Sequence, residues 1–312
     1  MPLPTKLERY KGCLLGLAAG DALGVTLEFQ KPGSFQLLTD MIGGGPFNLK
    51  PGEWTDDTSM ALCLAESLIA SDGFDPKDQL SRYLRWYRTG YWSSTGKCFD
   101  IGNTIRRALH KFETTNDPFC GETAPETAGN GSLMRLAPIP LFYADNIDEV
   151  IRYAADSSRT THAAETTLDA CRFYAALIVG ALAGEQKDSL LSKDYFSVAT
   201  KNQAQIFHPE VKAVAAGSYK HRHPPEIRGS GYVVHSLEAA LWAFQHSSSF
   251  AEGCLMAVNL GEDADTTGAI FGQLAGAFYG EKEIPKHWRS KLTRSFEIEQ
   301  LAESLLGDPR FE

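Results

Sequence analysis

The chain has 312 residues, of which 43% are apolar and 22% charged, a composition typical of a folded globular protein and not of a disordered or fibrous one. Its formal charge of −9, with lysines and arginines scattered along the sequence, argues against nucleic acid or an anionic membrane as a partner. The six cysteines are widely spaced and form no CxxC pair, so we expect a reducing compartment and a cytoplasmic protein.

Helical periodicity dominates the chain. Apolar residues recur at helical spacing, or form buried helical stretches, over residues 5–19, 58–70, 76–88, 99–112, 146–157, 163–183, 233–247, 250–259, 266–280 and 286–305. Loops rich in Gly, Pro and small polar residues occupy 41–54, 117–132 and 221–232, and none resembles a long flexible linker. We therefore predict an all-α fold, a compact multi-helical single domain over residues 1–312, and expect a monomer.

One predicted helix begins beside an unusual group of oxygen-bearing side chains. Thr55, Asp56, Asp57 and Thr58 precede the apolar residues of the helix over 58–70. Such residues at a helix start are most often caps, because they accept hydrogen bonds from free backbone N–H groups and suit the helix dipole. Taken alone, this segment favours capping over a metal site.

A second segment repeats the arrangement near the other end of the chain. Asp263, Asp265, Thr266 and Thr267 precede the predicted helix over 266–280. The carboxylates at the two helix starts are Asp56, Asp57, Glu262, Asp263 and Asp265, more than capping requires. If the two starts meet, a hard divalent cation would offset the repulsion, and an oxygen-only set suits Mg²⁺ or Mn²⁺ better than zinc. Two cations about 3.5 to 4 Å apart could then orient a water and polarise a substrate oxygen.

Seven stretches of the sequence together resemble one known family. They are "GCLLGLAAGDALGVTLEF" (12–29), "WTDDTSMAL" (54–62), "CFDIGNTIRRAL" (98–109), "AGNGSLMRLAPIPLF" (128–142), "SSRTTHAAET" (157–166), "GSGYVVHSLEAALWAF" (229–244) and "GEDADTTGAIFGQLAGA" (261–277). In this order they resemble the ADP-ribosylglycohydrolases, and more closely the bacterial dinitrogen-reductase-activating (DraG-like) branch than the vertebrate enzymes.

The resemblance implies an all-helical fold with a central cleft that holds two Mg²⁺ or Mn²⁺ ions. It implies hydrolysis of the bond between C1″ of ADP-ribose and an acceptor. By motif position, the metal ligands would be Thr55, Asp56 and Asp57 on one side and Asp263, Asp265 and Thr266 on the other. Because both halves are intact, the sequence argues against a degenerate, non-catalytic relative.

Two further carboxylates are candidate catalytic residues. Glu28 follows the "GDALG" turn expected to end the first helix, and the resemblance places it near the metals, although a lone Glu is ordinarily a surface residue. Asp100 matches a carboxylate that the DraG-like enzymes place beside the ribose. Its alternative is to be the N-cap of the helix that follows.

Glycine-rich turns and two ring side chains are candidate substrate-binding residues. Gly129, Asn130, Gly131 and Ser132 offer backbone N–H groups for a pyrophosphate, although such a segment is otherwise an ordinary turn. Gly102 and Asn103 would support ribose or phosphate in the same way. His162 is placed by the resemblance near the ADP portion, where we expect it to bind substrate, although such a residue is commonly a half-buried histidine. Tyr232 could stack on adenine or belong to the core.

We therefore expect a metal-dependent hydrolase that removes ADP-ribose from an ADP-ribosylated protein, with the arginine N-glycosidic bond favoured. The same site could instead act on serine-linked, nucleic-acid-linked or small-molecule ADP-ribose. Two other classes remain open, namely a non-catalytic ADP-ribose binder or structural relative, and a metal phosphohydrolase that would release phosphate.

Overall fold

The computed structural model describes residues 3–201 and 207–307, and within these ranges the regular structure is helical. The predicted all-α class is confirmed, since the described residues form isolated β-bridges but no strand. The α-helices are α1 (Lys6–Gly24), α2 (Asp56–Ser71), α3 (Pro76–Thr89), α4 (Asn103–Thr115), α5 (Pro138–Phe142), α6 (Ile147–Arg159), α7 (Glu165–Leu182), α8 (Lys187–Leu190), α9 (Tyr195–Ala199), α10 (Pro209–Ala215), α11 (Val233–His246), α12 (Phe250–Val258), α13 (Ala264–Tyr279), α14 (Lys286–Arg289) and α15 (Ser295–Leu306). Short 3₁₀ turns occur at Pro125–Thr127, Ser218–Lys220 and Glu281–Glu283.

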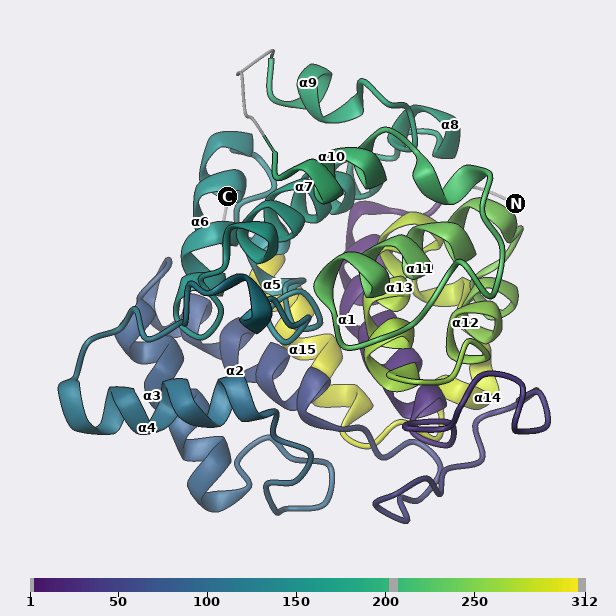
Figure 1. The fold of residues 1–312 in the computed structure, drawn as a ribbon. Coiled ribbons are helices and arrows are strands. Elements are labelled where there is room, and N and C mark those ends of the chain that lie inside the picture. The colour runs from purple at the N-terminus through teal and green to yellow at the C-terminus, as the bar shows by residue number, and fades with distance from the viewer. Residues whose placement is uncertain (1–2, 202–206, 308–312) are drawn as a thin grey trace.

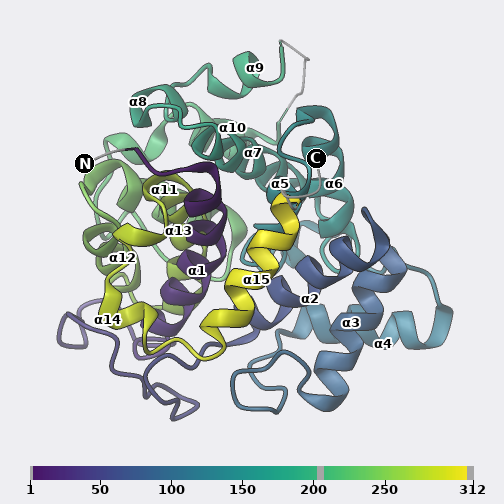
Figure 2. The ribbon, with the colours of Figure 1, turned by 180° about the vertical axis from the view of Figure 1, so that it is seen from behind.

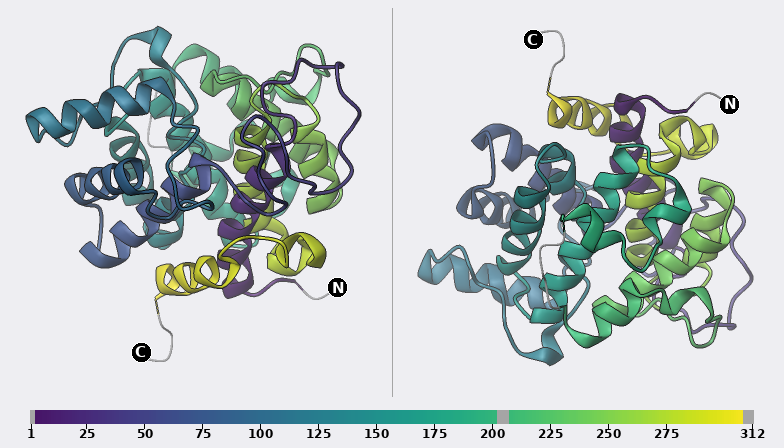
Figure 3. Two further views of the ribbon diagram at one scale, coloured as in Figure 1. Left: turned by 90° about the horizontal axis from the view of Figure 1, so that it is seen from below. Right: turned by 90° about the horizontal axis from the view of Figure 1, so that it is seen from above.

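The helices are arranged around a central pair, α1 and α13 (Figures 1 and 2). Helices α11 and α12 pack against α13 on one side, and α15 lies between α1 and α2 on the other. Beyond α2, α3 and α4 form the outer part of the molecule, while α6 and α7 pack together near α5 (Figure 3). The first helix and one of the last are therefore neighbours at the centre.

Glycines bring α1 and α13 into backbone contact. Gly12, Gly16, Gly20 and Gly24 of α1 face Gly276, Gly272, Gly268 and Ala264 of α13, so the two helices are antiparallel. A Cβ added to Gly16 would lie 2.3 Å from the carbonyl oxygen of Gly272, and one added to Gly272 would lie 1.9 Å from that of Gly16. No larger residue fits this glycine seam without moving a helix.

Helix α1 is longer than the sequence analysis predicts. It begins with a capping box, in which the Thr5 side chain accepts from the Glu8 N–H and the Glu8 side chain accepts from the Thr5 N–H. It then continues through "GDALG" to Gly24, where a terminating turn was expected. Gly20 and Gly24 are tolerated within the helix because they pack against α13. The extension places Asp21 inside a buried helix.

Two other predicted helices need correction. The helix over 99–112 begins at Asn103, because Asp100 has a left-handed backbone (φ 58°) and Gly102 is the N-cap. Asp100 is therefore not the cap. The helix over 286–305 is divided into α14 and α15, with Arg294 in a left-handed conformation (φ 55°) immediately before α15. The apolar stretch 173–184 lies mainly in α7, and no described helix is long and apolar enough to cross a membrane.

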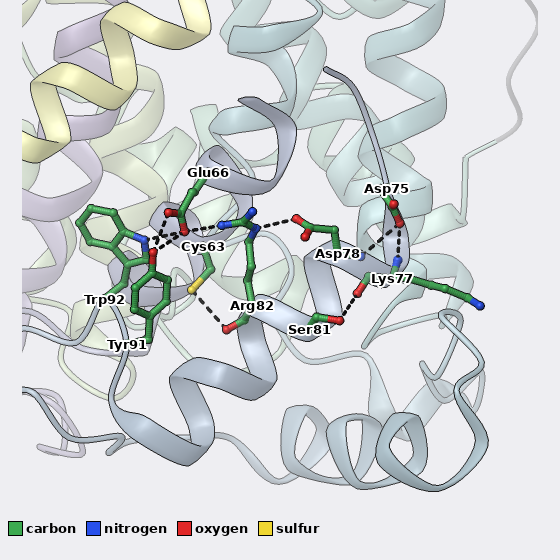
Figure 4. A network of polar contacts seen from close by, with 9 residues as sticks. All are labelled: Cys63, Glu66, Asp75, Lys77, Asp78, Ser81, Arg82, Tyr91 and Trp92. Carbon is green, nitrogen blue, oxygen red and sulfur yellow. Dashed lines mark hydrogen bonds and ion pairs between the residues drawn. The ribbon is translucent and has the colours of Figure 1, made fainter. Parts of the chain in front are cut away.

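A polar network ties the loop after α3 to α2 (Figure 4). Glu66 of α2 accepts hydrogen bonds from the hydroxyl of Tyr91 at 2.6 Å and from the indole N–H of Trp92 at 3.1 Å. Arg82 of α3 pairs with Glu66 at 2.6 Å and with Asp78 at 2.5 Å. The network anchors the start of the loop that leads to Asp100.

Candidate metal centre

The two acidic helix starts meet in the folded chain. The hydroxyl oxygen of Thr55, before α2, lies 3.3 Å from Asp265 Oδ2 of α13, across 210 positions of sequence. Thr266 donates in the opposite direction to Asp57 Oδ1 at 3.3 Å. The structure therefore brings together the two segments that the sequence analysis could only place on separate helices.

Asp21 organises this meeting, and the sequence analysis missed it. One of its oxygens accepts from the backbone N–H and hydroxyl of Thr55, at 2.9 and 3.0 Å. The other accepts from the backbone N–H and hydroxyl of Thr58, at 3.0 and 2.6 Å. Asp21 thus caps α2 from a different helix. The available signal was an aspartate inside the apolar stretch 12–29, which a surface helix would not place on its buried side.

Capping by Asp21 leaves the acidic side chains of α2 free for another role. Thr55 occupies the N-cap position but makes no side-chain capping bond, and neither does Asp263 at the start of α13. Thr58 serves the helix through Asp21, and Ser59 donates to the Thr55 carbonyl at 2.8 Å. The capping interpretation of these segments is therefore wrong for Thr55 and Asp263.

Burial of these carboxylates makes their charged forms unfavourable. Desolvation, followed by repulsion from neighbouring carboxylates, raises the pKa of Asp56, Asp57 and Asp265 well above the usual value. Desolvation also raises the pKa of Asp263, and it raises the pKa of Asp21 to about 6 despite four hydrogen bonds from Thr55 and Thr58. Without a cation, this cluster tends to hold protons.

Glu28 and Asp100 extend the cluster toward the surface. Glu28 is 2% exposed, and its Oε2 is buried without a hydrogen-bond partner among the described residues. Burial, then the charge of Asp100, raises the Glu28 pKa to about 9. Burial, then the charge of Asp263, raises the Asp100 pKa to about 7. A protonated and an ionised carboxyl can therefore coexist here near neutral pH.

The oxygen atoms are close enough to share cations. One ligand oxygen from each of Asp21, Asp57 and Asp265 lies within 4.8 Å of the others, and the same holds for Glu28, Asp100 and Asp265. Asp265 belongs to both groups, and its Oδ1 is buried without a partner. Both groups are made of oxygen alone, which suits a hard divalent cation. The residues present therefore fit a metal centre.

A cavity of about 660 Å³ opens above these carboxylates. It is lined by Glu28, Asp56, Asp100, Asp263, Asp265 and Thr266, and by the predicted substrate-binding residues Gly102, Asn103, Gly129, Asn130, Gly131 and His162. Thr55 and Asp57 lie beneath this lining, fully buried. The Asn130 amide donates to Asp263 Oδ2 at 2.8 Å, which joins the glycine-rich turn to the acidic cluster.

Two predicted substrate-binding residues lie outside the lining. The Ser132 hydroxyl is buried against that of Ser158 at 2.7 Å. Tyr232 forms a bridge with Gly129, but its hydroxyl donates to Glu210 Oε2 at 2.6 Å. Conversely, Phe29 lines the cavity although the sequence analysis assigned it no role, and Glu262, expected only as one of the carboxylates at the helix starts, lines it as well.

The sequence profile of the ADP-ribosylglycohydrolase family matches residues 2–311. The chain belongs to this family. An ADP-ribosylarginine hydrolase Tri1 from Serratia proteamaculans is 42% identical over 98% of this chain and 81% of its own length. An ADP-ribosyl-[dinitrogen reductase] glycohydrolase from Rhodospirillum rubrum is 32% identical over 95% of this chain and 94% of its own length. The predicted family is thereby confirmed.

A solved structure is also similar to this glycohydrolase family member. It is described as an ADP-ribosylglycohydrolase-related protein complex, with a TM-score of 0.84 and 45% sequence identity. The match covers 96% of this chain and 98% of the other. The similarity therefore extends over the whole helical fold and is not confined to the acidic motifs.

Proposed function

We propose that this chain hydrolyses the N-glycosidic bond between ADP-ribose and an arginine side chain of a modified protein. The observation that carries the proposal is the convergence of the α2 and α13 starts, with their carboxylates, beneath one cavity. The substrate class is supported by relatives named ADP-ribosylarginine hydrolases, at 42% and 43% identity. Relatives named ADP-ribosylhydrolase ARH3 are 25% identical, a weaker similarity than that to the arginine hydrolases.

We propose two Mg²⁺ or Mn²⁺ ions as cofactors, held by Thr55, Asp56, Asp57, Asp263, Asp265 and Thr266. Bound there, the cations would supply positive charge for substrate oxygens and for an ordered water. Asp21 would keep Thr55 and the first turn of α2 in place. The support is the unpartnered, buried Asp265 Oδ1 and the carboxylate oxygens of Asp57 and Asp265, which lie within 4.8 Å of each other.

Proton transfer belongs to Glu28 and Asp100 in this proposal. Hydrolysis breaks the bond between C1″ and the guanidine nitrogen, forms a bond between C1″ and a water oxygen, and moves one proton from the water and one to the leaving nitrogen. A carboxylate must accept the first proton and a carboxyl must donate the second. Without a bound cation, burial raises the pKa of Asp100 to about 7 and that of Glu28 to about 9, and this difference supports one group for each task.

The remaining cavity residues would bind the ADP portion. Gly129, Gly131 and Gly102 allow a pyrophosphate or ribose to approach the backbone closely. Asn103, Asn130 and His162 add polar side chains to the lining. Ser132 supports this wall from behind, and Tyr232 would reach adenine only from the rim.

The proposal is tested by presenting arginine-, serine- and nucleic-acid-linked ADP-ribose to the protein with Mg²⁺, Mn²⁺ or EDTA. We expect release of free ADP-ribose from arginine, abolished by EDTA. Release from serine or nucleic acid alone would replace the substrate class, and release of phosphate would indicate a phosphohydrolase. Binding of ADP-ribose without hydrolysis of any conjugate would indicate a non-catalytic binder.

We also propose that residues 1–312 form one monomeric domain in the cytoplasm. One cluster of buried apolar residues extends from α1 to α15 through the described chain, which supports a single folding unit. Light scattering after gel filtration would test the monomer, and limited proteolysis would test the single unit.

A further inference from the structure

A buried arginine lies behind the wall of the cavity. Arg135 has no exposed surface, and its guanidinium carbon is 4.6 Å from the centre of the Tyr83 ring. One terminal nitrogen donates to the Thr161 hydroxyl at 2.6 Å, and the other contacts the Met60 sulfur at 3.7 Å. Thr161 is therefore the one oxygen acceptor of this guanidinium among the described residues.

The hydroxyl of Thr161 also contacts the imidazole of His162, so its hydrogen bond with Arg135 limits which nitrogen of that ring can carry a proton. Thr161 Oγ1 lies 2.8 Å from His162 Nδ1, and Thr161 is fully buried. A guanidinium can only donate, so Thr161 must accept from Arg135. The hydroxyl proton then has one partner available among the described residues, His162 Nδ1. If Nδ1 carried a proton, the buried hydroxyl would have no acceptor, which is costly.

The opposite edge of the imidazole faces the cavity. His162 lines the cavity, and a Cβ added to Gly131 would lie 3.1 Å from its Nε2. The backbone of His162 is fixed as well, because its N–H donates to the Ser158 carbonyl at 2.7 Å and its carbonyl accepts from the Ser158 hydroxyl at 2.8 Å. The ring can therefore present Nε2 toward a bound molecule beside the glycine-rich turn.

We propose that Arg135 and Thr161 are positioning residues that hold His162 as the neutral Nε2–H tautomer, so that it donates a hydrogen bond to an oxygen of the bound substrate. The nature of that substrate, ADP-ribose on an acceptor, rests on the proposed function. Burial, then the nearby charge of Arg135, lowers the His162 pKa to about 3, which is consistent with a neutral ring. A phosphate or ribose oxygen is the chemical class of acceptor that this donor fits.

The tautomer can be read directly by ¹⁵N NMR of histidine-labelled protein, without substrate. Long-range ¹H–¹⁵N correlations distinguish a protonated from an unprotonated ring nitrogen, and a His162→Gln variant identifies the signal. We expect protonated Nε2 and unprotonated Nδ1 in the parent protein. Thr161→Val and Arg135→Met should each give a mixture of tautomers or the Nδ1–H form, whereas Thr161→Ser should restore the parent pattern.

Tyr83→Phe is the matched control. It keeps the ring beneath Arg135 but removes a buried hydroxyl that accepts from the Gln79 amide at 3.0 Å. A general loss of buried polar contacts would affect Tyr83→Phe and Thr161→Val alike, whereas the proposal predicts a tautomer change in Thr161→Val alone. If Arg135→Met fails to fold, comparison of Thr161→Val with Thr161→Ser still shows whether Thr161 sets the tautomer of His162.

Steady-state kinetics give the functional readout. For Thr161→Val we expect KM for the ADP-ribosylated substrate to rise about tenfold with a smaller change in kcat, and Thr161→Ser to restore it. An Nδ1–H ring in the parent protein, or an unchanged tautomer in both Thr161→Val and Arg135→Met, would overturn the inference. The expected tautomers in a protein that hydrolyses no ADP-ribose conjugate would instead contradict the proposed function alone.

Discussion

The glycine seam and the acidic cluster are built on the same two helices but are stabilised in opposite ways. Along the seam, backbone atoms of α1 and α13 touch, and the nearby side chains are apolar. At the end of the same helices, Asp21 and Asp265 lie buried beside carboxylates of α2. The seam depends mainly on close packing, whereas the cluster depends on protons or cations.

The glycine seam holds the helices in position, and the acidic cluster supplies the chemically active groups. Close packing at Gly20 and Gly24 fixes where α13 begins, and so fixes Asp265 relative to Asp21. Because the backbones of α1 and α13 are in contact, the two helices cannot move apart to relieve the repulsion among the carboxylates.

The pH dependence of stability should show the largest effect. The raised pKa values of Asp21, Asp100 and Glu28, about 6, 7 and 9, mean that the folded protein holds protons that the unfolded chain releases above pH 4.5. In EDTA, the free energy of unfolding should therefore fall by several kcal/mol as the pH rises from 5 to 9. Urea unfolding measures this. Mn²⁺ should reduce the fall, and equal stability at both pH values in EDTA would contradict the assignment.

Breaking the seam should cost nearly as much. In Gly272→Ala the new Cβ would lie 1.9 Å from the Gly16 carbonyl oxygen, so the helices must separate. We expect a loss of about 3 kcal/mol in unfolding free energy at pH 5. Gly102→Ala is the control, since its nearest neighbour would be 4.0 Å away. A fully stable Gly272→Ala protein would show that the seam is not tightly packed.

Removing one carboxylate from the cluster should separate stability from activity. Asp57→Asn keeps the shape of the side chain but replaces a charged oxygen proposed as a metal ligand, so hydrolysis should fall at least about 100-fold. Because repulsion is relieved, the variant in EDTA should be as stable as the parent, or more so. Asp145→Asn, which removes an exposed ion pair with Lys6, should leave hydrolysis unchanged. Full activity of Asp57→Asn would remove it from the metal site.

Asp21→Asn should weaken the hydrogen bonds that join α1 to the start of α2. An amide accepts through one oxygen only, so either Thr55 or Thr58 loses the acceptor for its buried N–H. We expect the unfolding free energy at pH 7 to fall by about 1.5 kcal/mol. Activity should also fall, about tenfold. Unchanged activity would mean that Asp21 does not position α2.

The smallest effect belongs to the distant end of α1. Thr5→Ala removes the acceptor of the Glu8 N–H, at 3.2 Å, and should cost about 1 kcal/mol in thermal or urea unfolding. Thr5→Ser should restore it. Since Thr5 lies far along α1 from Asp21, hydrolysis should be unchanged in both. A large loss of activity would show that the seam does not isolate the site from the helix start.

Helical periodicity and motif order predicted the fold class and the family, and they singled out acidic residues that the fold brings together at the starts of α2 and α13. They failed where tertiary packing overrode local preference. Gly20 and Gly24 indicate a helix end by propensity, yet their contact with α13 keeps them helical. Asp21 was missed for that reason, because its role depends on a longer α1.

The direction in which each side chain points could not be predicted from the sequence either. Thr55 could have capped α2 by its sequence position. In the fold Asp21 of α1 accepts the hydrogen bonds of the helix start, and the Thr55 side chain makes no capping bond. Ser132 belongs to a cavity motif but turns toward Ser158, and Tyr232 turns toward Glu210. The motifs predicted that these residues lie near the cavity, but the packing of the fold determines which of them line it.

The antiparallel contact of α1 with α13 also sets an order of events during synthesis. Helix α1 leaves the ribosome early, but the partner that covers Gly16 and Gly20 is made only when residues 264–279 emerge. Contacts so distant in sequence form slowly and leave apolar surface exposed meanwhile. A nascent chain that stops before α13 therefore has neither a covered α1 nor a complete cluster, which ties the appearance of activity to the completion of folding.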